Sequence, residues 1–207
     1  LIQDDWNGFN LLSKNTGLVN GLEIGFVSKD ETINAKSILE KAESGEIKLI
    51  FLQGADDNID FSKLENCFVV YIGSHGDNSA HHADVILPSC AYSEKEATYV
   101  NLEGRPQAST RAVFAQGEAK EDWRIISDLA QNLNINLGYS NISDLRNSLI
   151  ESNPIFANLG NVSKAEWSNS NEISKEFEEK RISVEDYNFY LTNPISRASR
   201  TLNKCGK

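Results

Sequence analysis

Residues 66–106 decide the fold, and they read NCFVVYIGSHGDNSAHHADVILPSCAYSEKEATYVNLEGRP. Phe68–Ile72 is an unbroken apolar run that stops at Gly73, which is typical of a strand buried on both faces in the middle of a parallel sheet. A second short run, Val85–Leu87, stops at Pro88. The polar turn between the two runs holds all three histidines of the chain. The pattern therefore places polar side chains at the carboxyl edge of a sheet, where α/β proteins bind ligands.

Upstream of this stretch the sequence predicts helices that alternate with strands. Asp30–Ser44 has apolar residues at helical spacing, Ile47–Leu52 is another buried apolar run, and Asp60–Glu65 suits a short helix. Right-handed crossovers then make Ile47–Leu52 and Phe68–Ile72 neighbouring parallel strands, and both are expected at the centre of the sheet. The predicted fold class is α/β, with a Rossmann-like, doubly wound and mainly parallel sheet.

The rest of the chain is less regular. We expect a Rossmann-like domain over 1–135 and a helical and extended C-terminal extension over 136–207 that packs on it. Glycines at 17, 21 and 25 predict a loop. The other expected elements are a short helical stripe with Trp6, Phe9, Leu11 and Leu12, a helix over Gly117–Leu133 with Trp123, Ile126, Ala130 and Leu133 on one face, a helix over Ser143–Ser152 with a serine cap, a strand at Thr98–Asn101, and a strand with Tyr187, Phe189 and Leu191.

Composition excludes several classes of protein. The formal charge of −10 argues against a nucleic-acid surface, and no apolar stretch approaches the roughly 20 residues of a membrane helix. Cys67, Cys90 and Cys205 are far apart and form no Cys-x-x-Cys pair, so neither a disulfide scaffold nor a four-cysteine cluster is expected, and a reducing compartment is favoured. The chain contains no methionine, and we expect it to be a piece of a longer polypeptide.

Several motifs resemble those of the molybdopterin oxidoreductase superfamily. They are Ala83–Pro88, Tyr92–Lys95 and Thr98–Arg105. Within that superfamily, Ile72–Asp77 and Phe189–Ser199 resemble one branch, the G subunit, which is the large iron–sulfur subunit of NADH–quinone oxidoreductase (respiratory complex I). Asn7–Asn10 and Gly21–Phe26 fit that branch as well. The resemblance is strong over 66–110 and 187–205, moderate over 1–55 and weak over 135–180.

The resemblance implies a C-terminal scaffold domain of the G subunit, in the peripheral arm of a proton-translocating enzyme that passes electrons from NADH to quinone. It implies no catalytic, cofactor-binding or metal-binding residue in this chain, with 2Fe-2S and 4Fe-4S clusters in a preceding part of the full-length polypeptide. The implied partners are other peripheral-arm subunits, with neither nucleic acid nor direct membrane insertion. The implied location is the cytoplasmic face of a bacterial inner membrane or the mitochondrial matrix side. Two alternatives stay open: a cofactor-binding domain of an active molybdopterin-dependent oxidoreductase, and an independent nucleotide-binding module.

Three groups of residues suggest chemistry, each with a structural alternative. His75, His81 and His82, with Asp77, Asp84 and Cys90, include zinc-ligand types but lack His-x-x-x-His spacing, so a polar loop that packs at the sheet edge is favoured. Within that loop, Asp84 is expected to accept backbone N–H bonds from the polar turn. Residues 73–76 follow a strand and could hold a phosphate, but the Gly-x-Gly-x-x-Gly and Walker fingerprints are absent, which favours a vestigial cofactor site.

The third group is charged and flanks the predicted strand at Thr98–Asn101. Glu94, Lys95, Glu96, Glu103 and Arg105 suggest either paired catalytic carboxylates or an ion-paired turn, and the ion-paired turn is favoured. Ser93 lacks the Gly-x-Ser-x-Gly pattern of a nucleophile. Near the C-terminus, Arg197, Arg200 and Lys204 suggest a basic segment that folds back on its own domain or docks an acidic neighbour, and fold-back is the expectation.

Overall fold

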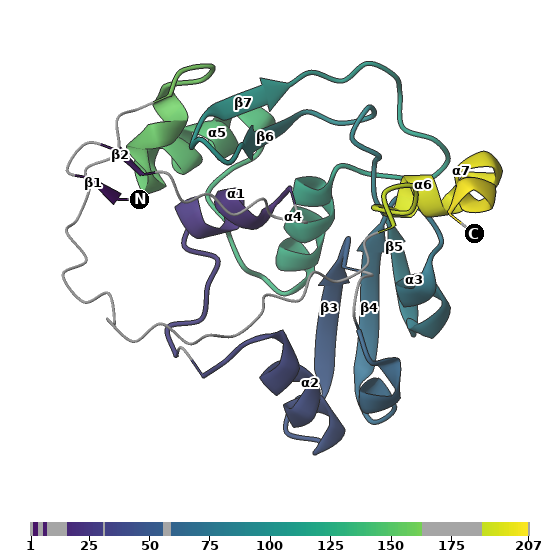
Figure 1. Ribbon diagram of the computed structural model, residues 1–207. Helices are drawn as coiled ribbons and strands as arrows, with labels where there is room; N and C mark the ends of the chain where they lie inside the picture. The colour runs from purple at the N-terminus through teal and green to yellow at the C-terminus, as the bar shows by residue number, and fades with distance from the viewer. Residues whose placement is uncertain are drawn as a thin grey trace.

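Figure 1 shows the computed structural model, which describes residues 2–3, 6–7, 16–30, 32–55, 59–162 and 188–206. Helices and strands are mixed along the chain, as an α/β protein requires, and the largest sheet has three parallel strands. In chain order the elements are β1 (Ile2–Gln3), β2 (Trp6–Asn7), α1 (Leu18–Glu23), α2 (Ala35–Glu43), β3 (Leu49–Gln53), η1 (Phe61–Leu64), β4 (Phe68–Gly73), α3 (Asn78–His82), β5 (Val85–Pro88), β6 (Ala97–Val100), β7 (Pro106–Ser109), α4 (Asp122–Asn132), α5 (Ile142–Ser152), η2 (Pro154–Ala157), α6 (Pro194–Ala198) and α7 (Arg200–Cys205). No helix in this described part of the chain is both long enough and apolar enough to cross a membrane.

The prediction that the two apolar runs form neighbouring parallel strands is confirmed, but only β4 is central: among the described strands β3 lies at an edge of the sheet, and only its Leu52 is fully buried. β3 pairs in parallel with β4, with Leu49 opposite Phe68, and β5 pairs on the other side of β4, with Val70 opposite Val85. The strand order is β3-β4-β5. Because the three strands run in one direction, their carboxyl ends meet at a single edge of the sheet, which contains Gly73.

One face of the parallel sheet carries the core. Leu52 of β3 and Val69 and Tyr71 of β4 are buried against Ala42 of α2 and Leu64 of η1. These side chains alternate with those of the opposite face because successive strand residues point to opposite sides. The short helix predicted at Asp60–Glu65 is thereby confirmed as η1, which closes the core beside α2.

The opposite face of the sheet is covered unevenly. Val70 and Ile72 of β4 are only 6% and 4% exposed, whereas Phe51 and Phe68 are 44% and 49% exposed. The prediction of burial on both faces is therefore correct for β4 from Val69 onward and wrong at its first residue. At the end of the face that contains Phe68 and Phe51, the described residues do not cover the sheet, so both rings stay partly in solvent.

The helix before β3 begins later than predicted. α2 begins at Ala35 because Asn34 and Ser37 form a capping box: Asn34 Oδ1 accepts from Ser37 N at 3.1 Å, and Ser37 Oγ accepts from Asn34 N at 2.8 Å. Asp30, the predicted start, instead forms a turn in which its Oδ1 accepts from Thr32 N at 2.9 Å. Gly45 follows the helix with a φ of 77°, a conformation that favours glycine.

The strand predicted at Thr98–Asn101 is confirmed as β6, which forms an antiparallel hairpin with β7. Val100 lies opposite Pro106 and is 2% exposed. Asn101 closes the turn, since its Oδ1 accepts from Glu103 N at 3.0 Å and from Arg105 N at 2.9 Å.

Helix α4 lies within the predicted range, but its predicted face is buried only in part: Ala130 is buried and Trp123 half-buried, and the other two members are exposed. Ile125 and Ala130 are 8% and 6% exposed, whereas Ile126 and Leu133 are 38% and 61% exposed. Just before the first turn of the helix, Lys120 N donates to Pro88 O at 3.1 Å and Cys90 N donates to Lys120 O at 2.9 Å, so residues far apart in sequence hold the start of α4. The helical period alone does not contain these contacts.

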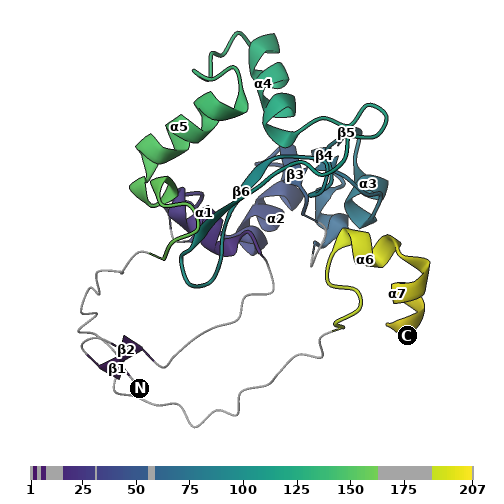
Figure 2. The same cartoon turned by 90° about the horizontal axis from the view of Figure 1, so that it is seen from above.

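The second predicted helix is confirmed as α5, with a different cap. Asn141, not a serine, caps it: Asn141 Oδ1 accepts from Ser143 N at 2.9 Å and from Asp144 N at 3.0 Å. At the other end of the helix, Asn153 Nδ2 donates to Glu23 O at 2.9 Å and to its carboxylate at 2.8 Å. This contact ties α5 to the end of α1 (Figure 2).

Predictions near the two termini were less accurate. The glycines at 17, 21 and 25 do not mark a loop, because Leu18–Glu23 forms α1. Trp6 lies in β2 and not in a helix, while Phe9, Leu11 and Leu12 lie outside the described residues.

The predicted strand with Phe189 and Leu191 is wrong, because residues 188–193 form turns in which Asn188 Oδ1 accepts from Tyr190 N at 3.1 Å. Tyr187, the third residue of that predicted strand, lies outside the described residues. The division of the chain at residue 135 stays a prediction.

Candidate functional site

The first candidate site is the loop that leaves β4 at the carboxyl edge of the parallel sheet. Tyr71 reaches along this loop, and its hydroxyl donates to His75 O at 3.1 Å. A side chain on Gly73 would collide with the ring of Tyr71, so the loop needs glycine at this position. The hydroxyl of Ser74 lies 3.0 Å from His75 Nδ1. The loop is therefore held by its own side chains, with Tyr71 packed across it.

Asp77 joins this loop to two helices. Its Oδ1 accepts from Asn78 N at 3.0 Å at the start of α3, and its Oδ2 accepts from Arg197 Nε of α6. Both side chains of the ion pair are largely buried, with 15% of Asp77 and 19% of Arg197 exposed. Figure 1 shows α6 beside β5 and α3. The C-terminal segment therefore reaches the edge of the sheet where the sequence placed a candidate phosphate site.

Capping interactions shape this C-terminal segment. Asn193 Oδ1 accepts from Ser196 N at 2.9 Å and Ser196 Oγ accepts from Asn193 N at 3.1 Å, which starts α6 directly after the turn. Asn188 Nδ2 donates to Gly206 O at 2.8 Å and so closes the two ends of the segment on each other. The expectation that the basic C-terminal segment folds back on its own domain is confirmed at Arg197.

The three histidines do not converge. His81 and His82 lie on α3 and not in a polar loop as the sequence suggested, while His75 lies in the loop after β4. The ring of His82 stacks on Phe61 at 4.2 Å between centroids, and its Nδ1 lies 2.8 Å from Asn78 O. No three His, Cys, Asp or Glu side chains in the described ranges are grouped so that they could hold a metal ion.

Asp84, the residue just before β5, is hydrogen-bonded to Val69 of β4. Its Oδ2 accepts from Val69 N at 2.7 Å and not from the polar turn that the sequence suggested; its own N–H donates to Val69 O at 2.9 Å. Cys67 is buried in the same core, and burial, with a smaller effect of the Asp84 carboxylate, raises the pKa of its thiol. Cys90, 3% exposed, also has a thiol pKa raised by burial and next by Glu94.

The interpretation of the charged residues around β6 as an ion-paired turn is confirmed. Lys95 pairs with Asp122 at the start of α4, and Glu96 pairs with Arg146 of α5 at 3.2 Å. Glu94 accepts from Ala91 N at 2.9 Å. Glu103 and Arg105 lie 3.7 Å apart at the hairpin turn. Two of these ion pairs thus attach the hairpin to α4 and α5.

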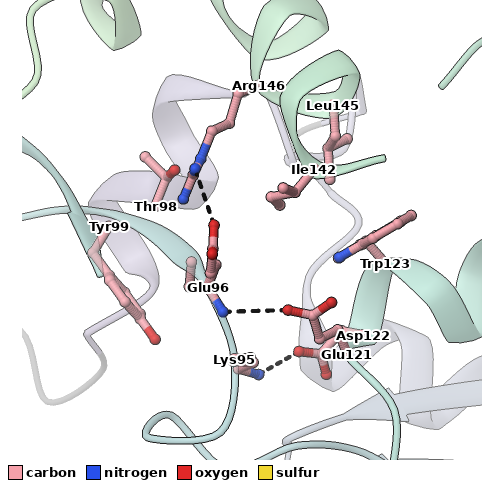
Figure 3. Close-up of a pocket in the computed structure, with 11 residues that line it drawn as sticks. Lys95, Glu96, Thr98, Tyr99, Glu121, Asp122, Trp123, Ile142, Leu145 and Arg146 are labelled. Carbon is pink, nitrogen blue, oxygen red and sulfur yellow. Dashed lines mark hydrogen bonds and ion pairs between the residues drawn. The ribbon is translucent and has the colours of Figure 1, made fainter. Parts of the chain in front are cut away.

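A pocket of about 250 Å³ lies where these elements meet (Figure 3). β6, the start of α4 and the first turns of α5 supply its walls. Neither Arg146 nor the indole N–H of Trp123 was predicted from the sequence as a binding group. The sequence placed Trp123 only on an apolar helix face. The residues around Arg146 form no pattern that would identify it as a binding group. The lining residues are Lys95, Glu96, Ala97, Thr98, Tyr99, Glu121, Asp122, Trp123, Ile142, Leu145 and Arg146.

Comparison with known proteins gives two family matches and a consistent set of relatives. The family model for molybdopterin oxidoreductase matches residues 1–132, and the model for the C-terminal part of the G subunit of NADH-ubiquinone oxidoreductase matches residues 150–205. The G subunit of NADH-quinone oxidoreductase from Rickettsia bellii is 42% identical over 208 residues, which cover 99% of this chain and 28% of the relative.

Two further relatives align in the same way. The NADH-ubiquinone oxidoreductase 75 kDa subunit of Reclinomonas americana is 38% identical over 97% of this chain and 29% of its own length. The mitochondrial 78 kDa subunit of Candida albicans is 38% identical over 97% of this chain and 28% of its own length. The chain thus spans less than a third of the length of these curated relatives. Because the first model covers well over half of the 207 residues, the chain belongs to the molybdopterin oxidoreductase family.

Proposed function

We propose that the chain is a non-catalytic scaffold domain of the G subunit of an NADH–quinone oxidoreductase. One observation carries this proposal: relatives named as this G subunit, or as the 75 and 78 kDa subunits, align over 97–99% of the chain. The match of residues 150–205 to a model specific to the G subunit supports this branch over other members of the family. In the assembled enzyme, electrons would pass from NADH through iron–sulfur clusters to quinone, coupled to proton translocation.

The finer description of the fold belongs to the same proposal. The order β3-β4-β5 with parallel pairing supports a Rossmann-like sheet, because such sheets are built from successive parallel strands joined by crossovers. We propose that residues 1–135 form this domain and that 136–207 form an extension packed on it. The ion pair between Asp77 and Arg197 supports that packing.

The carboxyl edge of the sheet does not fit the phosphate groups of a pterin nucleotide. Asp77 brings a carboxylate to the edge, and Arg197 is held against that carboxylate. The ring of Tyr71 packs against Gly73, where backbone N–H groups would otherwise approach a phosphate. These contacts support a vestigial site that α6 now occupies, and no chemical step is assigned to it.

The cysteines support the proposal that the clusters belong to the part of the relatives that this chain does not cover. Cys67 and Cys90 are buried as single thiols, and Cys205 is exposed near the C-terminus. Iron–sulfur clusters require groups of thiolates, and three separated cysteines do not supply four ligands. The domain would contact other peripheral-arm subunits, on the cytoplasmic face of a bacterial inner membrane or on the matrix side in mitochondria.

The direct test is a chimera. Residues 1–207 replace the matching segment of a full-length bacterial G subunit in a strain that lacks its own copy. The proposal expects assembled enzyme and NADH–quinone activity in membranes to be restored, and both to be lost when the segment is deleted. A chimera that is made in normal amounts but never joins the other subunits would count against the proposal.

A second test separates this proposal from an active molybdopterin-dependent domain. The purified chain is expected to contain no stoichiometric metal, to show no visible absorbance from a pterin or cluster, and to leave NADH unoxidised. Metal analysis, an absorbance scan and an NADH oxidation assay after gel filtration measure the three properties. A chromophore that co-elutes with the chain would favour the active enzyme.

A further inference from the structure

We propose that the outer edge of β3 pairs with a further parallel strand, and that the polypeptide joined to this strand covers the open face of the sheet. The strand would come from the part of a full-length G subunit that lies outside the region aligned with this chain. This inference rests on the proposed function, because it requires the chain to be one part of a longer polypeptide. The backbone of β3, the apolar face beside it and the handedness of the sheet point to this strand.

The two ends of β3 show which of its backbone groups face β4. At one end Phe68 N donates to Lys48 O at 2.8 Å, and at the other end Gly54 N donates to Ile72 O at 2.8 Å. In a parallel pair, alternate residues of a strand turn both N–H and C=O toward the same neighbour. The residues between them point these groups away from β4, and they are Leu49, Phe51 and Gln53.

This outer edge of β3 is unprotected. No hydrogen bond to the outward backbone groups is found among the residues that the structure describes. Natural edge strands are guarded against pairing by charged residues, proline, a bulge or a covering segment. β3 reads LIFLQ, pairs with β4 over its whole length without a bulge, and contains neither a charged residue nor proline. Such an edge is a template for another strand.

The sheet face opposite the core is open beside this edge. Leu49 lies opposite Phe68, and in the next register position on the same face Phe51 lies opposite Val70, which in turn lies opposite Val85. Val70 is buried, whereas the other four side chains are 37–51% exposed. Purely parallel sheets occur almost only with both faces covered. Apolar side chains gathered on neighbouring positions therefore indicate a surface that another segment buries.

The handedness of the connections places the missing strand outside β3. η1 joins β3 to β4 and α3 joins β4 to β5, and both pack on the core face, as α2 does. Because crossovers between parallel strands are right-handed, a connection on this face always moves in the direction from β3 to β5. α2 leads into β3 on the same face, so the strand that precedes α2 in this sheet would lie on the outer side of β3. Among the described residues before α2, no strand belongs to this sheet.

Length and charge favour the longer polypeptide as the source of the strand. The aligned region covers 28–29% of the relatives, so more than two-thirds of their length lies outside it. A second copy would bring together two chains of formal charge −10, which repel each other. A separate subunit would bind as a free partner, whereas a strand of the same polypeptide is held near β3 at an effective concentration on the order of millimolar.

The test is amide hydrogen exchange in the purified chimeric G subunit that carries residues 1–207, resolved to single residues by mass spectrometry with electron-transfer fragmentation. The amides of Leu49, Phe51 and Gln53 are expected to exchange at least about a hundredfold more slowly in the chimera than in the 207-residue chain, because a paired strand amide exchanges only after opening. The amides of β4 are the internal reference and should be protected in both.

Three outcomes would overturn the inference. The first is equally fast exchange of the outward amides in chimera and chain. The second is protection already present in the 207-residue chain, from its own residues or, if it rises with concentration, from a second copy. The third is protection that appears only in the assembled enzyme, which would assign the edge to another subunit. Exchange is measured before assembly, so a protected chimera that fails to join the other subunits contradicts only the proposed function.

A pair of variants at Gln53 tests the backbone contact itself. Gln53→Pro removes one outward N–H and no bond to β4, and edge strands tolerate proline in this orientation. In the chimera it should speed the exchange of Phe51 by about tenfold, because the added strand loses a hydrogen bond. Gln53→Ala removes the same side chain but keeps the N–H, and should leave this exchange unchanged. Equal exchange in the two variants would contradict the added strand.

Hydroxyl-radical footprinting tests the covering of the face. Oxidation of Phe51 and Phe68 should fall severalfold between the 207-residue chain and the chimera. Phe114, 81% exposed in the loop after β7, lies outside the sheet and serves as the reference for radical dose. Unchanged oxidation of both sheet phenylalanines would show that the face stays open in the longer polypeptide, and the covering of the face would then be wrong.

Discussion

Asp84 is the residue whose side chain bridges the backbones of two neighbouring strands. It lies just before β5, and its carboxylate accepts from the N–H of Val69, a residue of β4 that is 2% exposed. We expect Asp84→Ala to lower the free energy of unfolding by about 1–3 kcal/mol, because Val69 N–H is left without a partner in the core. Chemical denaturation measures this change.

The matched control is Asp84→Asn, which keeps an oxygen that can accept from Val69 N–H. It should lose clearly less stability than Asp84→Ala. If both substitutions cost the same, the carboxylate contributes through its charge and not through this hydrogen bond. If neither changes the unfolding curve, the contact contributes nothing measurable.

The three cysteines should differ in reactivity. Burial raises the pKa of the thiols of Cys67 and Cys90, so less thiolate is present near neutral pH, and both side chains are also shielded; Cys205 is exposed. With a thiol-reactive disulfide reagent we expect one fast equivalent in the native chain and two more only after unfolding. Cys205→Ser should abolish the fast phase, and a fast phase that survives in this variant would show that a core cysteine is accessible.

At the scale of single elements, the carboxylate of Asp144 contacts the residues that begin α5. Its carboxylate accepts from the hydroxyl of Ser140 at 2.9 Å and from Asn141 Nδ2 at 2.8 Å, and the Ser140 hydroxyl is the largest cause of the lowered pKa of Asp144. A folded-state pKa below the unfolded value means that the stabilisation is present above the unfolded pKa of about 3.9 and is lost as pH falls through the folded pKa.

We therefore expect Asp144→Asn to lower the Tm at neutral pH, and we expect the gap between wild type and variant to close as the pH falls below about 4. Glu151→Gln, an exposed carboxylate in the last turn of α5, is the control and should show a smaller effect at neutral pH. Thermal melts followed by circular dichroism across this pH range measure the gap. A gap that stays constant into acid would rule out a role for the charge.

The individual helices and strands also differ in how well the sequence predicted them. β3, β4 and β5 were predictable from their uninterrupted apolar runs, although burial on both faces explains such a run only for β4, since β3 and β5 lie at the edges of the described sheet. The start of α2 did not follow, since both Asp30 and Asn34 are capping residues, and only the reciprocal bond with Ser37 distinguishes them. The buried face of α4 was predicted only in part, because its helical period does not contain contacts between residues far apart in sequence, such as Lys120 and Pro88 just before the helix.

The candidate sites were predictable only in part, for a related reason. The loop after β4 was located from its polar residues, and Lys95 and Glu96 were correctly expected to form ion pairs. Their partners Asp122 and Arg146 could not be named, because they come from separate helices that the sequence pattern does not place. Asp77 and Arg197 are 120 residues apart, and no local periodicity links them.

At the scale of the whole molecule, the ion pair between Asp77 and Arg197 fastens the C-terminal segment 188–206 to the carboxyl edge of the sheet. Arg197→Ala leaves the Asp77 carboxylate, only 15% exposed, without this cation, which makes the docked position of the segment costly. We expect amide hydrogen exchange in α6 and α7 to accelerate by at least about tenfold, which corresponds to a loss of about 1.4 kcal/mol. The amides of β3, β4 and β5 should keep their protection, since their core does not include this pair.

Arg200→Ala is the matched control, because it removes an exposed cation from the same segment and should leave exchange nearly unchanged. Asp77→Asn separates two roles of Asp77: its oxygen can still accept from Asn78 N at the start of α3, but the charge that faces Arg197 is gone. This variant should therefore release α6 and α7 while α3 stays protected. Equal acceleration across α6, α7 and the parallel sheet would mean that the segment and the sheet unfold as one cooperative unit, and the idea of a separately docked C-terminal segment would be wrong.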